Sequence, residues 1–299
     1  MAMNALLASI QSTQQAQAEK RREPKVAACS FGVGVQSTTL AFLTMAKDPE
    51  LLRCMKGLLP TKFVFSDTGD EPASVYRHLE SMKSTMTQRG LELTVLCRGS
   101  LGEHILGRIA SGRRGMSSLP LFVRGKDGTM GPMRRKCTSD FKSRLIDPYM
   151  RDYAAPRGFL SHWMGISMDE AHRMRTTLDD WRVFDYPLVE MRWTRERCIE
   201  YLREQVYVDG NPTAVVKSAC YFCPFRRPEE WRRLRDEDPV EWQRALDFEA
   251  KVTAAPLPGM REIGYLNRRG VSIAEYADVG STQNADVSWD AECAGVCGV

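Results

Sequence analysis

Short apolar runs alternate with amphipathic stretches along the first part of the chain. Strands are expected at residues 26–29, 62–66, 91–96 and 159–166, and helices at residues 38–47, 71–88 and around 170–175. Apolar runs of this length fit strands that are buried on both faces, and strands that alternate with helices form a parallel sheet. The pattern therefore predicts an α/β fold with a doubly wound parallel sheet. Because ligands of such sheets bind at the carboxyl ends of the strands, the loops after Cys29, Phe65 and Ile166 are expected to converge.

The distribution of these patterns predicts three regions. Residues 1–24 are rich in Gln, Ala and Ser and are interpreted as a flexible arm. Residues 25–205 form the α/β domain, and residues 206–299 form a mostly helical and irregular extension that contains cysteines. Residues 100–148 are rich in Gly and Arg with weak periodicity, so they are interpreted as a long functional excursion. Further helices are expected near residues 229–235 and 239–252.

Composition excludes several classes of protein. A chain of 299 residues, 43% of them hydrophobic, can bury a large core, which excludes disorder throughout. No apolar run is long enough to span a membrane and the N-terminus lacks the zones of a secretory signal, so a cytoplasmic location is expected. Nine cysteines, an odd number, argue against complete disulfide pairing and favour metal binding, catalysis or packing. The net charge of +4 is mild, but basic residues gather in residues 108–144 and 226–235, which favours an anionic ligand.

A Gly-rich turn at residues 30–38 follows the first expected strand and opens a helix. Glycines let the backbone approach an anion, and the hydroxyls and N–H groups of a helix start can hold phosphate oxygens. The turn lacks the Gly-Lys-Ser/Thr end of a Walker loop and the spacing of a dinucleotide fingerprint. An ordinary glycine turn is the alternative. The candidate phosphate-binding residues are Ser30, Gly32, Gly34, Gln36, Ser37 and Thr38.

This turn resembles the PP-loop of the adenine-nucleotide hydrolase superfamily, whose usual form is Ser-Gly-Gly-x-Asp-Ser, with Gln36 where the family often has Asp. Further resemblances to phosphoadenylyl-sulfate reductases and N-type ATP pyrophosphatases follow in order along the chain. They are the Asp-Thr-Gly segment at residues 67–69, the Gly-x-x-x-x-Glu-x-x-Arg segment at residues 165–173, and the Pro-Leu and Trp-Thr pairs at residues 187–188 and 193–194. The resemblance implies a Rossmann-like fold that binds ATP or another adenine nucleotide with Mg²⁺.

The resemblance also implies roles for particular residues. Asp67, Thr68 and Gly69 would lie near the adenosine, and Gly165 would belong to the nucleotide site. Glu170 and Arg173 would bracket phosphate or sulfate, so Asp67, Glu170 and Arg173 are the candidate catalytic residues. The alternatives are a turn role for Asp67 and a surface ion pair at i,i+3 for Glu170 and Arg173.

Cys220 and Cys223 form a C-x-x-C motif, in which two thiolates can bind one metal or cluster. The segment around Cys137 resembles the one that carries a cysteine pair in cluster-containing adenylyl-sulfate reductases, which implies a third ligand of a [4Fe-4S] cluster. A fourth ligand could come from Cys297 or Cys293, or an iron could stay open. A structural zinc or a redox-active dithiol are the alternatives. The remaining cysteines, Cys29, Cys54, Cys97 and Cys198, are expected to pack among apolar neighbours.

The leading hypothesis is an ATP pyrophosphatase that adenylylates a nucleic-acid or nucleotide substrate, after which sulfur replaces the activated oxygen. Arg134, Arg135, Lys142 and Arg173 would bind the second anionic partner. Under this hypothesis, the protein is expected to interact with a sulfur-donor protein and with a second copy of the chain. The alternatives are a reductase of adenylyl sulfate or its phosphorylated form, and a nucleic-acid-binding module with a degenerate nucleotide site.

Overall fold

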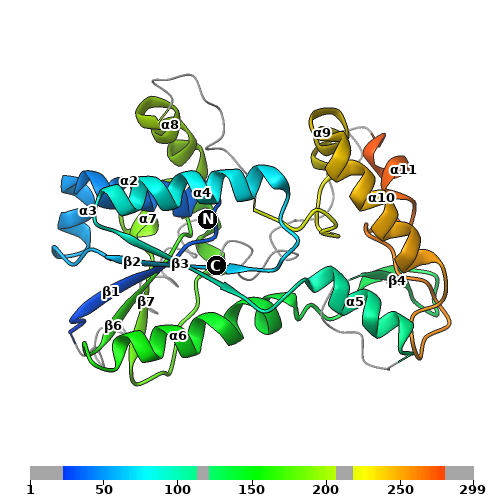
Figure 1. Cartoon of the computed structure of the whole chain (residues 1–299), viewed down its shortest axis with the longest axis horizontal. Helices are drawn as coiled ribbons and strands as arrows, with labels where there is room; N and C mark the ends of the chain where they lie inside the picture. Colours follow the sequence, from blue (N-terminus) through cyan, green and yellow to red (C-terminus); the bar gives the residue numbers. More distant parts are fainter. Residues whose placement is uncertain (1–22, 113–120, 207–217, 280–299) are drawn as a thin grey trace, which may run out of the picture.

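The computed structural model describes residues 23–112, 121–206 and 218–279, and its centre is a parallel sheet of five strands (Figure 1). In spatial order the strands are β3 (Glu92–Cys97), β2 (Lys62–Asp67), β1 (Val26–Ser30), β6 (Leu160–Met164) and β7 (Arg182–Asp185). The predicted α/β fold with a doubly wound parallel sheet is confirmed. Sequence analysis missed β7, because only two apolar residues, Val183 and Phe184, stand between its charged ends.

The strand order reverses between β1 and β6. The chain proceeds outward from β1 through β2 to β3, then returns to the other side of β1 to add β6 and β7. Ser30, the last residue of β1, is in register with Met164, the last residue of β6. In open parallel sheets the connections diverge at such a switch point and leave a crevice outside the carboxyl ends of the strands.

Helices cover both faces of the sheet (Figure 1). One face is covered by α2 (Val35–Ala46), α3 (Pro49–Cys54), α4 (Ala73–Gln88), α7 (Pro187–Glu190) and α8 (Arg195–Val206), and the other by α6 (Arg144–Ala154). Successive side chains of a strand point to opposite faces. Accordingly, Ala27 and Cys29 of β1 pack in the cluster with α2 and α4, while Ala28 packs with α6. Cys29 and Cys198 are buried in the first of these clusters and Cys54 packs against it, which confirms their expected packing. The same expectation is wrong for Cys97, whose thiol is exposed at the end of β3.

A second lobe is built around a hydrophobic cluster of its own (Figure 1). Its elements are α5 (Leu101–Ala110), β4 (Phe122–Arg124), β5 (Met130–Pro132), α9 (Pro228–Glu237), α10 (Pro239–Thr253) and α11 (Ile273–Ala277). Residues 100–148, interpreted above as an excursion, therefore contribute to a core. The signal was present, since Leu101 and Ile105 are spaced i,i+4 and Ser100 caps α5 by accepting the N–H of Glu103. Between β5 and α6 the chain forms a π-helical turn, η1 (Ser139–Ser143).

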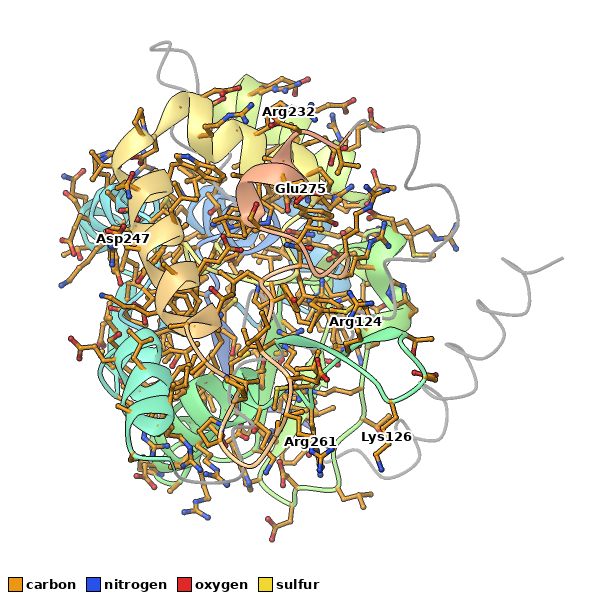
Figure 2. The ribbon with its side chains drawn as sticks, turned by 90° about the vertical axis from the view of Figure 1, so that its right-hand side faces the viewer. Arg124, Lys126, Arg232, Asp247, Arg261 and Glu275 are labelled. Carbon is orange, nitrogen blue, oxygen red and sulfur yellow. The ribbon has the colours of Figure 1, made fainter. Side chains whose placement is uncertain are left out.

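Charged side chains of this lobe face outward in Figure 2. Arg124 and Lys126, in and beside the β4–β5 hairpin, are exposed (Figure 2). Several arginines of the second basic segment instead support the structure. Arg232 donates to the carbonyl oxygens of Ala277 and Val279, which ties α9 to the end of α11 (Figure 2).

The buried carboxyl of Glu249 on α10 predicts a pH-dependent stability of this lobe. Glu249 accepts the N–H of Ile273 at 2.8 Å, and burial raises its pKa from 4.5 to about 7. Because folding favours the uncharged form, the contribution of this carboxyl to stability is fully present below pH 4.5 and is lost as pH rises through 7. From pH 5 to 8, we expect the free energy of unfolding in urea to fall by on the order of 2 kcal/mol less in Glu249→Gln than in the wild type. Glu229→Gln, an exposed exchange on α9, is the control, and an unchanged slope in Glu249→Gln would contradict the prediction.

Candidate functional site

The loop after β1 is a tight, strained connection to α2. Val33 has a φ of 58°, a left-handed conformation that is unusual for a β-branched residue, and its side chain is fully buried. Gly34 caps α2, and its N–H and carbonyl groups both lie 3.2 Å from the hydroxyl of Ser37. Such strain persists only where the surroundings fix the backbone, and it concentrates at binding sites.

Residues 165–173, which follow β6, meet this loop across the switch point. A Cβ atom on Gly165 would lie 3.1 Å from the backbone nitrogen of Ser37, so the two loops are in close backbone contact. Gln36 donates from Nε2 to Glu170 Oε2 at 2.9 Å and to the hydroxyl of Ser167 at 3.4 Å. The expected convergence of these two loops is confirmed.

Glu170 and Arg173 lie in a short 3₁₀ helix, η2 (Met168–Arg173). Arg173 Nη1 lies 2.9 Å from Glu170 Oε2, and the side chains are 10% and 27% exposed. The pair is therefore no ordinary surface ion pair, since it is largely enclosed and continues into Gln36. The buried Nε of Arg173 has no hydrogen-bond partner within the described residues.

Thr38 lies apart from the other candidate phosphate-binding side chains. Its hydroxyl is 3.1 Å from Nε2 of His78 on α4, and its N–H donates to the carbonyl of Gly34. His78 is buried, and burial lowers its pKa to about 4, so the ring is neutral at physiological pH. The Thr38 side chain thus joins α2 to α4. Ser30 ends β1 and is fully buried, with its hydroxyl 2.8 Å from Nε2 of His162 on β6, so Gln36 and Ser37 are the candidate side chains that remain at the loop.

The loop after β2 is organised by two carboxylates. Asp67 accepts the N–H of Gly69 and the hydroxyl of Tyr76, both at 2.8 Å. Asp70 is buried and accepts the N–H of Gly102 at 2.8 Å and the hydroxyl of Ser100. Burial raises the pKa of Asp70, although these hydrogen bonds oppose the shift. The expected turn around Asp67 is thus part of a larger junction that joins β2 to α5.

Gly69 is required at this junction. Its φ is 74°, and a Cβ atom would lie 2.9 Å from Cα of Ser100. We expect Gly69→Ala to destabilise the protein by about 2 to 3 kcal/mol, because backbone strain and a clash with main chain add together. Gly90→Ala is the matched control, since Gly90 has a φ of 73° but nothing within 4 Å of the added methyl group. Equal shifts of the two variants in urea unfolding would refute the close approach.

A cavity beside this loop is lined by three of the four candidate metal ligands. Cys137, Cys220 and Cys223 all line it, and its empty space is about 480 Å³ including the part open to solvent. The further lining residues are Thr68, Glu71, Leu101, Arg135, Thr138, Lys142, Ser218, Ala219, Pro224 and Phe225. Cys297 and Cys293 lie outside the described residues. Across residues 23–112, 121–206 and 218–279, no three His, Cys, Asp or Glu side chains are close enough to hold one metal ion.

The C-x-x-C loop is fixed to the sheet by direct contacts. Thr68 Oγ1, one residue beyond β2, lies 3.2 Å from Cys220 Sγ, and Tyr221 donates its N–H to the carbonyl of Asp70. Arg226 is buried and donates to the carbonyl oxygens of Ala219 and Cys220. This arginine was grouped with residues expected to bind an anion, but its guanidinium holds the loop instead.

The charges around Cys220 act in opposite directions on its thiol. Burial raises the pKa of Cys220 well above its ordinary value, and the carboxylate of Glu71 raises it further. The hydrogen bond from Thr68 and the charge of Lys142 lower it. Glu71 itself accepts a hydrogen bond from Ser218 at 3.3 Å. Sequence analysis missed Glu71 and Ser218, since neither belongs to a motif that marks the cavity.

The four residues expected to bind a second anion lie in three different places. Arg135 and Lys142 line the cysteine cavity, where Arg135 also donates to Thr138 at 2.9 Å. Arg173 lies at the switch point with Glu170. Arg134 is exposed on the segment between β5 and η1. The hydroxyl of Ser66 at the end of β2 donates to the carbonyl of Phe141 at 2.6 Å, which places Lys142 beside the sheet edge.

These features define an α/β protein with a five-stranded parallel sheet, a strained loop at its switch point and a cysteine-lined cavity beside the next strand. A scan against models of protein families and a search of curated proteins both gave no match. Within the described part of the chain, every helix is too short or too polar to cross a membrane.

Proposed function

We propose that this chain is a PP-loop ATP pyrophosphatase that adenylylates a nucleic-acid or nucleotide substrate for iron–sulfur-dependent sulfur transfer. The observation that carries the proposal is the meeting of residues 30–37 with Gly165 and Glu170 at the switch point, beside the cavity lined by Cys137, Cys220 and Cys223. The switch point is where open parallel α/β sheets bind ligands, and two of the segments that resemble the PP-loop family, residues 30–38 and 165–173, meet there.

In the proposed reaction, an oxygen of the substrate attacks the α-phosphorus of ATP, and the bond between that phosphorus and pyrophosphate breaks. Backbone N–H groups at the start of α2 and the hydroxyl of Ser37 would bind phosphate oxygens. Arg173 would stabilise the negative charge that develops on the leaving pyrophosphate, because a guanidinium matches phosphate geometry and keeps its charge. The loop after β2, with Asp67 and Thr68, would hold the adenosine.

The residues at the switch point suit Mg²⁺. This ion binds through one or two carboxylates together with substrate phosphates, and Glu170 supplies a carboxylate with the amide of Gln36 beside it. Bound Mg²⁺ would offset the charge of the phosphates. The ion pair between Glu170 and Arg173 would keep both groups at the phosphates and hold their side chains in place before nucleotide binds.

The residues of the cavity suit an iron–sulfur cluster. Thiolates are the ligands of such clusters, and three cysteines from two separate segments line one cavity. A bound [4Fe-4S] cluster would supply the sulfur chemistry. A zinc ion held by the same thiols is the alternative, and it would require the three described thiols to come closer together than they lie here. Arg135 and Lys142 on the wall would attract the anionic backbone of a substrate toward the thiols.

The test is pyrophosphate release from ATP by anaerobically purified protein with Mg²⁺, a sulfur donor and defined RNA or DNA. Release that depends on the nucleic acid, with sulfur incorporated into it, is the expected result. Protein that binds no adenine nucleotide and releases no pyrophosphate with any of these substrates overturns the proposal.

A sulfonucleotide reductase is the second candidate, favoured by the contact between Thr68 Oγ1 and Cys220 Sγ at 3.2 Å. This contact brings the expected adenosine side and the cysteines together, as a reaction on a nucleotide-borne sulfuryl group requires. Sulfite release from adenylyl sulfate or its phosphorylated form, with thioredoxin or dithiothreitol as reductant, would favour this candidate. Substitution of Cys293 or Cys297 by serine must then abolish the release.

A further inference from the structure

The β4–β5 hairpin packs against a later segment of the second lobe, residues 257–271. Phe122 on β4 and Tyr265 form an antiparallel pair in which the N–H of each residue donates to the carbonyl of the other, at 2.9 and 2.8 Å. Beside this pair, a Cβ atom on Gly264 would lie 2.7 Å from a side-chain carbon of Leu121. Two segments that are far apart in sequence thus form one surface.

Three exposed cations gather at one end of this surface. Because the pairing is antiparallel, the chain after Phe122 and the chain before Tyr265 extend in the same direction from the pair. Along this direction, Lys126 and Arg261 each lie four residues from the pair, and Arg124 lies two residues from it. All three side chains are exposed, and Figure 2 shows them in the lower right part of the lobe. We call these three residues the hairpin cations.

The surface carries a large positive charge. Residues 121–136 and 257–271 contain eight lysines and arginines but only two acidic residues, Asp127 and Glu262, whereas the net charge of the whole chain is +4. Asp127 holds the turn of the hairpin, where it accepts the N–H of Thr129 at 3.1 Å and its hydroxyl at 2.7 Å. A local excess of positive charge attracts anions through the summed field of its members.

Neighbouring carboxylates do not neutralise the hairpin cations within the described residues. In the part of the chain that the structure describes, no Asp or Glu oxygen lies within 4.0 Å of their side-chain nitrogens. Arg124 instead donates to the carbonyl of Gly128 in its own hairpin, at 3.1 Å. By contrast, Arg233 on α9 pairs with Glu237 at 2.7 Å. The hairpin therefore presents charges that an external anion can neutralise.

The base of the hairpin adjoins the cysteine cavity. The ring centroid of Phe122 lies 6.0 Å from that of Phe225, which lines the cavity together with Arg135. Cys137 follows the last residue of β5 by five residues, so it lies at most about 18 Å from the end of that strand. A duplex rises about 3.4 Å per base step, so about five steps cover this distance. A nucleic acid with one nucleotide at the cavity can therefore place neighbouring phosphates on the hairpin.

The composition of this surface favours nucleic acid over an acidic protein as the partner. The cores of protein–protein interfaces are enriched in aromatic residues and depleted of lysine. In residues 121–136 and 257–271, all of which are described, Met260 is the one large apolar side chain that is exposed, at 38%. Nucleic acids, in contrast, carry a charge at every nucleotide, and lysines and arginines bind them by displacing counterions.

We propose that the hairpin cations bind the phosphate backbone of a nucleic-acid substrate and lead one of its nucleotides to the cysteine cavity. The proposal rests on the proposed function and adds to it the substrate class, a polynucleotide and not a free nucleotide, and the surface that binds it. A free nucleotide has no contact with charges beyond the cavity, whereas a strand carries phosphates to both places.

The test is fluorescence anisotropy of labelled RNA and DNA oligonucleotides, each single- and double-stranded, with the full chain at several salt concentrations. Replacement of all three hairpin cations, by Arg124→Gln, Lys126→Gln and Arg261→Gln, is expected to weaken binding about 100-fold at about 0.1 M salt. The slope of log affinity against log salt should become less steep by about 2 for single strands and about 3 for duplexes, because three phosphate contacts are lost. Comparison of the four oligonucleotides identifies the form of nucleic acid that binds.

The matched control removes the same charge from the other lobe. Arg77→Gln, Lys83→Gln and Arg151→Gln change exposed residues on α4 and α6. This control should bind nearly as tightly as the wild type, because charges far from the bound strand are screened at this salt. Equal losses in the two triple variants, or a wild type that binds none of the oligonucleotides, overturn the proposal. Displacement of the oligonucleotide by polyglutamate at equal charge concentration overturns it as well, since the surface would then accept an acidic protein.

The outcomes separate this inference from the proposed function. Calorimetric affinity for a non-hydrolysable ATP analogue should be the same in the wild type and in the hairpin variant. Nucleic-acid binding that depends on the hairpin cations, without any pyrophosphate release, overturns the proposed function and leaves the binding surface. Pyrophosphate release at the same rate in the wild type and the hairpin variant, at limiting nucleic acid, overturns this inference alone. Thermal unfolding of each variant identifies any loss that comes from misfolding.

Discussion

Replacement of both Cys220 and Cys223 by serine is expected to abolish binding of iron and acid-labile sulfide, which should be about four of each per chain in the anaerobically purified wild type. Serine hydroxyls are poor ligands for iron, and the two residues supply two of the three cysteines that line the cavity. Iron and sulfide analysis with visible absorption spectra measures the loss. About one zinc per chain and no sulfide in the wild type would contradict the cluster mechanism and indicate a structural zinc site instead.

Two further variants make the cysteine experiment specific. Cys97→Ser changes an exposed thiol at the end of β3 that does not line the cavity, so it should keep the full metal content. Cys137→Ser changes a ligand candidate on a different segment, so it should lower the metal content without altering the C-x-x-C loop. Equal metal content in the wild type and in Cys137→Ser would remove this residue from the ligand set. Circular dichroism of each variant checks that the fold is kept.

Substitution of Arg173 by alanine is expected to slow pyrophosphate release about 100- to 1,000-fold, the usual effect of removing one preorganised donor from a developing charge. Arg173 is 10% exposed and reaches the switch point through Glu170, so its guanidinium is already oriented. Arg173→Lys keeps the charge but loses the two-pronged geometry, and we expect an intermediate rate. Rates at saturating ATP, with the calorimetric affinity for the analogue, separate binding from chemistry.

Arg233→Ala is the matched control for Arg173→Ala. Arg233 also pairs with a glutamate of its own helix, Glu237 at 2.7 Å, but both side chains are more than half exposed on α9. This variant should release pyrophosphate at the wild-type rate, since an exposed pair contributes little. An unchanged rate in Arg173→Ala would show that the arginine is structural, and a change in its thermal midpoint would then be the expected effect.

The amino-acid sequence by itself predicted the parts of this protein that depend on local patterns. The apolar runs at 26–29 and 62–66 lie within β1 and β2, because strands buried on both faces need continuous apolar residues. The start of a helix after the Gly-rich turn was also predicted, because glycines and hydroxyl side chains commonly precede a helix start. The C-x-x-C motif identified Cys220 and Cys223 as neighbours on one loop, and the structure places them on one cavity wall.

Only the tertiary structure decided which distant residues meet. The short strand β7 has two apolar residues and no helical or alternating pattern of its own, yet its pairing with β6 positions Arg182 beside His162. The second lobe likewise depends on contacts between residues about 120 apart, such as Phe222 beside Gly102, which no local pattern encodes. Propensity and periodicity report on neighbours along the chain, whereas strand order and loop convergence depend on the free energy of burying the whole core.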